Sequence, residues 1–304
     1  MRKILLASTA LVALGVSAAS ADISISGNAK WTYTSASSTG DASGDSFATS
    51  SEVSVASSFA SDSGLTYGTN MTLEGGDKKL FVKGSFGEVR FGGSGAGADF
   101  DTDAAVTDGE SSTATGYSGK ADTASSSDNR ISYFTPSVNG FSAGISLDDA
   151  GSAAGANNDV TEMGASYTQT VGDATVTVAY ASRDTAAAVG GANTGSSATS
   201  LGATISMGDL SVTVAQNTSE TDNGSSKGTG AGFGISYVLS EGLTLKAHTI
   251  SGEDDADATV DNTETAASLT YVVAPGLTAN LAYTDSEAGT TTSNATTAYV
   301  KVAF

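Results

Sequence analysis

The sequence predicts an all-β fold, a 16-stranded antiparallel transmembrane β-barrel. Three observations predict it. Apolar and polar residues alternate with a period of two in many short segments, short turns alternate with longer polar stretches, and no segment reaches the roughly 18 consecutive apolar residues of a membrane-spanning helix. Charged residues make up only 15% of the 304 residues, against about 25% in a typical soluble protein. A soluble helical enzyme and a helical membrane protein both fit poorly.

The first 21 residues have the order of a secretory signal peptide. Basic Arg2 and Lys3 precede an apolar core from Ile4 to Val16, and the segment ends in Ala19-Ser20-Ala21. The apolar core is too short to span a bilayer about 30 Å thick. We predict cleavage after Ala21, which leaves residues 22–304 as the barrel, with 304 − 21 = 283 residues and a net charge of −20 − 2 = −22. The chain is expected to be exported.

The period-two alternation predicts sixteen strands. Clear examples are ATVTVAY (174–180) and AYVKVAF (298–304), each with an apolar and a polar face. The mature length allows about 18 residues per strand and connection, enough for roughly ten in a tilted spanning strand. The predicted strands begin near Asp22, Phe47, Leu65, Lys79, Glu88, Asn129, Phe141, Val160, Ala174, Ala198, Leu210, Thr229, Leu243, Asn262, Leu277 and Asn294.

The connections predict which side of a membrane each strand end faces. Seven short turns lie after Ala60 and at Phe86, Pro136, Val171, Met207, Ser240 and Ala274. They alternate with eight longer polar stretches that begin near Ser35, Glu74, Gly93, Asp149, Asp184, Thr218, Gly252 and Ser286. Outer-membrane barrels have short periplasmic turns and long external loops, whereas a soluble sandwich would not sort its loops by parity. The alternation therefore favours an outer-membrane barrel with both termini on the periplasmic side.

Basic residues fall on the polar face of the predicted strands. Eight of the eleven in the mature chain lie there, and the other three lie in connections. A Lys or Arg facing lipid at mid-membrane costs about 2–4 kcal/mol, so this pattern fits a water-filled lumen. The residues that we predict as the basic pore wall are Lys30, Lys83, Arg90, Arg130, Lys246 and Lys301.

One connection, residues 93–128, is exceptionally long and acidic. Loops of this length are generally functional or disordered, and a sixteen-stranded barrel is wide enough to hold one inside. We expect the loop to narrow the lumen and to oppose its carboxylates to Lys83, Arg90 and Arg130. The simpler alternative is a solvated acidic surface loop. The acids predicted at the constriction are Asp99, Asp101, Asp103, Asp108 and Glu110.

Specific motifs flank this loop. KKLFVKGSFGEVRFGG (78–93) precedes it with a Phe86-Gly87 turn, and DNRISYFTPSVNGFSAGISL (128–147) contains Thr135-Pro136 and Gly140-Phe141. Together they resemble the general porins of Gram-negative bacteria, most closely the alphaproteobacterial (Rhodobacter-type) members. The resemblance implies that the third external loop folds into the barrel and that the chain forms a homotrimer with three separate pores.

The resemblance extends to the last residue and has one departure. Phe304 is similar to the terminal Phe that the barrel-assembly machinery recognises, although Val302 stands where an aromatic residue is often found. The constriction of the family often carries a dense arginine cluster, whereas this barrel has only Arg90, Arg130 and Arg183. The constriction is therefore expected to be wider or less polarised.

Composition excludes several other functions. The chain has no Cys and one His, which removes disulfides, thiol catalysis and histidine-rich metal sites. His248 has no G-x-S-x-G motif to serve, so we expect no enzyme activity, and the acidic net charge argues against nucleic acid as a partner. We expect no cofactor. Calcium is possible at an acidic cluster of Asp254, Asp255 and Asp257, although solvated external acids are the simpler interpretation.

Two functions remain open. The favoured one is a general diffusion porin in the bacterial outer membrane that passes ions and small hydrophilic solutes without energy coupling. The alternative is a secreted, acidic, calcium-stabilised surface-layer or adhesin protein without a pore. For the channel, the net charge predicts weak cation selectivity, against the opposing effect of the basic wall.

Overall fold

A computed structural model describes residues 21–39, 41–73, 78–102, 106, 123, 129–149, 159–187, 194–224, 226–254 and 261–304. Within these ranges it contains the predicted sixteen strands and the short helix α1 (Ala96–Phe100). The strands are β1 (Ala21–Ser38), β2 (Asp41–Ala60), β3 (Thr66–Thr72), β4 (Lys78–Gly84), β5 (Gly87–Phe91), β6 (Arg130–Phe134), β7 (Phe141–Asp148), β8 (Val160–Val171), β9 (Ala174–Thr185), β10 (Ser196–Met207), β11 (Leu210–Thr221), β12 (Lys227–Ser240), β13 (Leu243–Asp254), β14 (Asn262–Ala274), β15 (Leu277–Ala288) and β16 (Thr291–Ala303).

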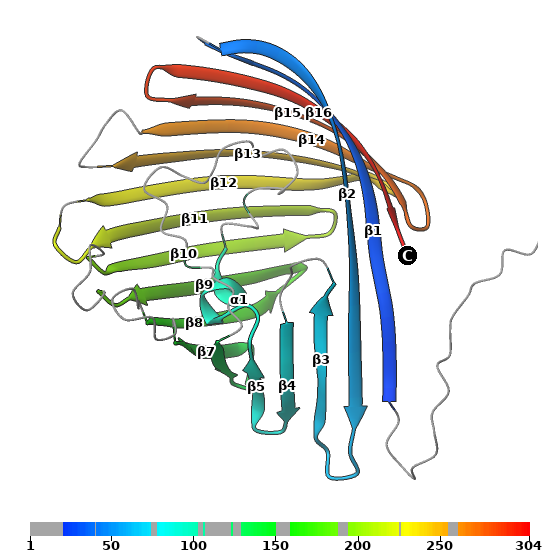
Figure 1. The fold of residues 1–304 in the computed structure, drawn as a ribbon, viewed down its shortest axis with the longest axis vertical. Coiled ribbons are helices and arrows are strands. Elements are labelled where there is room, and N and C mark those ends of the chain that lie inside the picture. The colour runs from blue at the N-terminus through cyan, green and yellow to red at the C-terminus, as the bar shows by residue number, and fades with distance from the viewer. Residues whose placement is uncertain are drawn as a thin grey trace, which may run out of the picture.

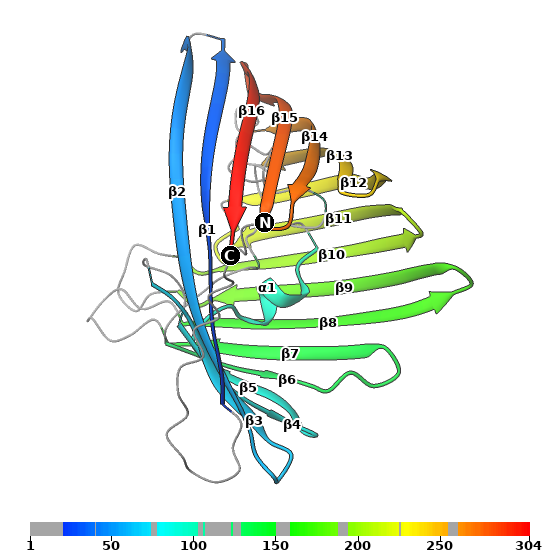
Figure 2. The ribbon, with the colours of Figure 1, turned by 90° about the vertical axis from the view of Figure 1, so that its right-hand side faces the viewer.

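Each strand pairs antiparallel with its neighbours in the chain, and β1 pairs with β16 to close the barrel. Figure 1 shows the strands following one another around the wall in chain order, and Figure 2 shows α1 lying against the strands β8 and β9. Closure gives every strand a neighbour on both sides, so the sheet has no terminal strand, which is a condition for a sheet to stand in lipid.

The two faces of the wall have the opposite polarity to those of a soluble protein, with apolar side chains outside and polar side chains inside. Large apolar side chains such as Leu201 and Leu281 are each 54% exposed on the outer face. Charged and polar side chains of the opposite parity, such as Glu162, Asn217 and Glu264, are almost completely buried. An apolar belt outside a polar interior is the arrangement of an outer-membrane barrel. We call the face that carries the buried polar residues the inner face.

Two of the long connections predicted from sequence are wrong. The stretches that begin near Ser35 and Ser286 are not loops, because β1 continues to Ser38 and β16 begins only three residues after Ala288. Ser35 pairs with Asp45, and Ser286 pairs with Ser293. Backbone pairing does not require apolar side chains where a hairpin extends into water. A prediction that ended strands where the composition becomes polar therefore placed these ends too early. For the same reason β2 begins at Asp41 rather than near Phe47.

No helix among the described residues is long and apolar enough to cross a membrane. The predicted signal peptide lies outside the described residues apart from Ala21, the first residue of β1.

The seam between the first and last strands ends in a contact between Gly27 and Phe304. Each residue donates its amide hydrogen to the carbonyl oxygen of the other at 2.9 Å. A Cβ atom on Gly27 would lie 2.7 Å from Cζ of the Phe304 ring and 2.6 Å from the carbonyl oxygen of Glu52. The absent side chain of Gly27 therefore makes room for the terminal ring on the outer face.

We predict that Gly27→Val destabilises the closed barrel by about 1–3 kcal/mol, the usual cost of overpacking. The measurement is the denaturant midpoint of the barrel in detergent micelles. Ala29→Val, on the next outward position of the same strand, is the control and should stay near the wild type. An unchanged midpoint for Gly27→Val would show that the ring does not depend on this space.

Candidate functional site: the inner wall and the long loop

The first residues of the long loop lie beside a buried ion pair of the inner wall. Arg130 on β6 donates from Nη2 to Oε1 of Glu162 at 3.1 Å and to Oδ2 of Asp148 at 3.3 Å, and the Arg130 and Glu162 side chains have no exposed area. Arg130 also donates from Nη1 to the carbonyl oxygen of Gly93, the first residue of the loop, at 3.3 Å. A buried guanidinium group thus links the wall to the loop.

The second oxygen of the Glu162 carboxylate binds a backbone amide of α1. The Gly97 amide donates to Oε2 of Glu162 at 2.9 Å, and the Ala96 amide donates to Oγ of Ser146 at 2.7 Å. Backbone amides at a helix start have no partner within the helix, so these acceptors of the wall satisfy them. Glu162 therefore binds Arg130 with one oxygen and the loop backbone with the other.

Three glycines on the inner face leave space for successive loop residues. A Cβ atom at Gly164 of β8 would collide with Phe100, one at Gly202 of β10 with Thr102, and one at Gly234 of β12 with the carbonyl oxygen of Val106. Val106 also packs in a buried cluster with Ala215 of β11 and Ile250 of β13. The described loop residues 93–102 and 106 thus lie along the inner face from β6 to β13.

One predicted pair of opposite charges is present. Asp99 of α1 accepts a hydrogen bond from Nη1 of Arg90 at 2.6 Å, while Nε of Arg90 donates to Oε1 of Glu88 at 2.5 Å. The guanidinium carbon lies 4.0 Å from the centre of the Phe134 ring, a cation–π distance. Arg90 is thus clamped between an acid of the wall, an acid of the loop and an aromatic face.

Asp101, the other predicted loop acid that the structure describes, contacts a different part of the wall. Asp101 accepts hydrogen bonds from Oγ1 of Thr123, another loop residue, and from Oγ of Ser200 on β10 at 3.1 Å. Asp101 therefore ties two parts of the loop to the wall. Asp103, Asp108 and Glu110 lie outside the described residues.

The remaining basic residues lie around the inner face. Lys30 and Lys301 are cross-strand partners, and Nζ of Lys30 lies 5.3 Å from the centre of the Tyr299 ring. Lys246 lies on β13 between Ser236 and Ser268 of its neighbours. Lys83 is exposed opposite Glu88 near the β4–β5 turn and makes no ion pair with any described residue. The expected pairing of Lys83 with a loop acid is therefore not seen among the described residues.

Sequence reasoning missed the acids of the wall. Glu162, which organises the loop entrance, lies on the same face as Gly164 in a strand that alternates polar and apolar residues, and that parity was the available signal. It also missed the partner of His248. Nε2 of His248 lies 3.0 Å from Oε1 of Glu264, and each of these two side chains is 1% exposed.

The described residues give no support to the calcium prediction. Within the described ranges, no group of three or more His, Cys, Asp or Glu side chains could hold a metal ion. Asp254 ends β13, while Asp255 and Asp257 lie outside those ranges.

We predict that Glu162→Ala destabilises the barrel by about 3 kcal/mol, because it leaves a buried guanidinium group with less compensation, and makes the loop more susceptible to protease. Both effects are measured on the detergent-purified protein, by denaturant titration and by limited proteolysis. Glu287→Ala, an exposed acid near the end of β15, is the control and should change stability by less than about 0.5 kcal/mol. Equal behaviour of the two variants would contradict the anchoring role.

Comparisons with known proteins agree with this architecture. The model of the Gram-negative porin family matches residues 7–302, while no curated protein matches the chain. Among solved structures, an anion-selective porin from Comamonas acidovorans aligns with a TM-score of 0.71 at 17% identity, covering 94% of this chain and 100% of that one. The trimer form of OmpT from Vibrio cholerae aligns with a TM-score of 0.70 at 16% identity, covering 93% and 99%.

A porin structure refined at 1.8 Å is similar to the same degree, with a TM-score of 0.70, 18% identity and coverage of 93% and 100%. At such identities these structures establish the shared fold. The family match covers nearly the whole chain, and with the closed sixteen-stranded barrel it shows that this protein belongs to the Gram-negative porin family.

Proposed function

We propose that this porin is a general diffusion channel of the outer membrane, in which the loop 93–128 narrows the lumen and Asp99, Asp101, Asp103, Asp108 and Glu110 face the basic wall. The observation that carries the proposal is the Arg90–Asp99 ion pair between wall and loop at 2.6 Å. This contact holds the start of the loop at the basic wall, so the remaining acids and bases would face each other across a narrowed aqueous section. Opposed charges there order water and select solutes by size and polarity. The pore-free surface-protein alternative finds no support in the family match.

Several finer properties belong to the same proposal. We propose export with cleavage after Ala21, assembly as a homotrimer and recognition of Phe304 during insertion. Passage is passive, without catalysis or a bound cofactor. The trimer form among the solved relatives supports the assembly. Lys30, Lys83, Arg90, Lys246 and Lys301 form the basic side of the pore, whereas Arg130, whose side chain has no exposed area, holds the start of the loop from within its buried ion pairs.

The direct test is conductance across a planar lipid bilayer with the purified protein at asymmetric salt. We expect stepwise openings in groups of three and a reversal potential of weak cation selectivity. Folded protein that leaves the bilayer silent would overturn the channel function. Openings that occur singly would leave a channel and contradict the trimer.

The loop position gives a second expectation. Gly234→Val would push against the backbone of Val106, and we expect it to displace the loop and raise single-channel conductance about 1.5- to 2-fold as the narrowest section widens. Valine is well tolerated in strands, so the wall itself should persist. Ala231→Val, which points outward from the same strand, is the control. Unchanged conductance of Gly234→Val would mean that this contact does not set the pore width.

Charge at the constriction gives a third expectation. Arg90→Gln leaves the Glu88 and Asp99 carboxylates without their counter-charge, and Lys83→Gln removes a positive charge from the same side of the pore. We expect each variant to raise the cation-to-anion permeability ratio about 2- to 3-fold at low salt, where surface fields are least screened. Reversal potentials measure it. An unchanged ratio in both variants would place these residues away from the constriction.

A further inference from the structure

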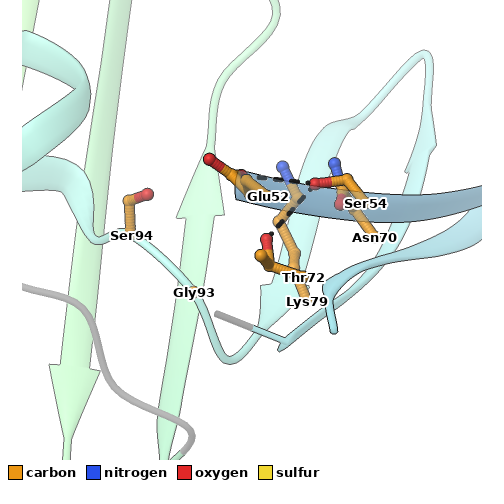
Figure 3. Close-up of a pocket in the computed structure, with 7 residues that line it drawn as sticks. All are labelled: Glu52, Ser54, Asn70, Thr72, Lys79, Gly93 and Ser94. Carbon is orange, nitrogen blue, oxygen red and sulfur yellow. Dashed lines mark hydrogen bonds between the residues drawn. The ribbon is translucent and has the colours of Figure 1, made fainter. Parts of the chain in front are cut away.

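A polar cavity of about 260 Å³ lies on the inner face beside the loop entrance. Its lining comes from three adjacent strands and the first loop residues, as Figure 3 shows: Glu52 and Ser54 of β2, Asn70 and Thr72 of β3, Lys79 of β4, and Gly93 and Ser94. The volume corresponds to roughly eight or nine waters at about 30 Å³ each. It is large enough for a solute of a few heavy atoms, and its side chains offer hydrogen bonds.

Two opposite charges line this cavity without neutralising each other. Ser54 Oγ donates a hydrogen bond to Oε1 of Glu52 at 3.4 Å and lies 3.3 Å from Oγ1 of Thr72, both drawn as dashed lines in Figure 3. The Lys79 ammonium group forms no ion pair or hydrogen bond with any described residue. In the same figure it points from β4 toward the β2 residues. By contrast, Arg90 and Arg130 are both paired.

The register keeps these groups together. Asn70 is the cross-strand partner of Lys79, and Ser54 is the partner of Thr72, so amide and hydroxyl groups separate the two charges. The loop backbone borders the cavity at Gly93, where a Cβ atom would lie 3.3 Å from Cβ of Lys79. Gly93 has a φ of +79°, which disfavours any other residue there.

We propose that this cavity is a subsite for small zwitterions, solutes that carry a carboxylate and an ammonium group on one short carbon skeleton, such as free amino acids with small side chains. Lys79 binds the carboxylate and Glu52 binds the ammonium group. Asn70, Ser54 and Thr72 provide hydrogen bonds between them. The inference rests on the proposed diffusion function, since it assigns that pore a preferred class of solute at its wall.

The experiment uses the full-length porin in a planar bilayer in 0.1 M KCl, with L-alanine as the probe and lactamide as a neutral solute of similar size. We expect L-alanine to reduce single-channel current with saturation in the millimolar range, because a charged pair at an aqueous wall binds weakly. Lactamide should produce only the linear decrease caused by occupied volume. Because salt screens exposed charges, the saturable block should weaken severalfold at 1 M KCl.

Two variants test the residues, and a third controls for net charge. Lys79→Met and the isosteric Glu52→Gln should each raise the half-saturating L-alanine concentration at least about 5-fold, the loss expected when one of two weak charge contacts is removed. Lys83→Met makes the same charge change on the same face of β4, outside the cavity, and should shift the reversal potential without moving half-saturation. The folded state of each variant is checked by its mobility on unheated gels.

The outcomes separate the two proposals. Absence of channels from folded protein overturns the diffusion function itself. Channels with identical, unsaturable responses to L-alanine and lactamide leave that function standing and overturn the subsite. Equal effects of Lys79→Met and Lys83→Met would also overturn it, because the cause would then be net pore charge.

Discussion

The described residues at the start of the long loop, 93–102, depend on one carboxylate of the inner wall, that of Glu162. A buried carboxylate is costly unless charge and hydrogen bonds compensate it. Here Arg130 supplies the charge, and the Gly97 amide supplies a hydrogen bond from the loop backbone. The carboxylate is fully compensated when the loop lies against the wall, so removal of the loop would remove one of its hydrogen-bond donors. That coupling makes the docked loop part of the barrel's stability.

The wall makes room for the described loop residues because glycines stand where those residues approach it. Gly164, Gly202 and Gly234 each remove a side chain where the loop approaches, at Phe100, Thr102 and Val106 respectively. Glycine weakens a strand interior, but pairing on both sides in a closed barrel compensates for that weakness. At these three positions the inner face therefore has no side chain that would collide with the loop residues. Polar and charged side chains line other parts of the face, including the Lys79–Glu52 cavity.

The sequence was sufficient for the barrel and insufficient for most contacts of the site. Period-two alternation and loop parity predicted the strand number because every strand has one face toward lipid and one toward water, so each strand carries the same pattern. They misplaced the polar ends near Ser35 and Ser286, since hairpins extend beyond the membrane by backbone pairing alone. The sequence placed Arg90 opposite the loop acids, and Asp99 pairs with it. The partnership of Glu162 with Arg130 could not be predicted, because it depends on the register of β6, β7 and β8, which no local pattern encodes.

The most direct measurement of loop docking uses the natural absence of cysteine from the chain. A Cβ atom at Gly164 would lie 2.7 Å from Cβ of Phe100, close to the roughly 3.5–4.5 Å span of a disulfide after slight relaxation. In the double variant Phe100→Cys with Gly164→Cys, the account predicts nearly complete crosslinking in the folded barrel and equal single-channel conductance before and after reduction. Failure to crosslink, or a conductance that falls on oxidation, would contradict a loop that is already docked on the inner wall.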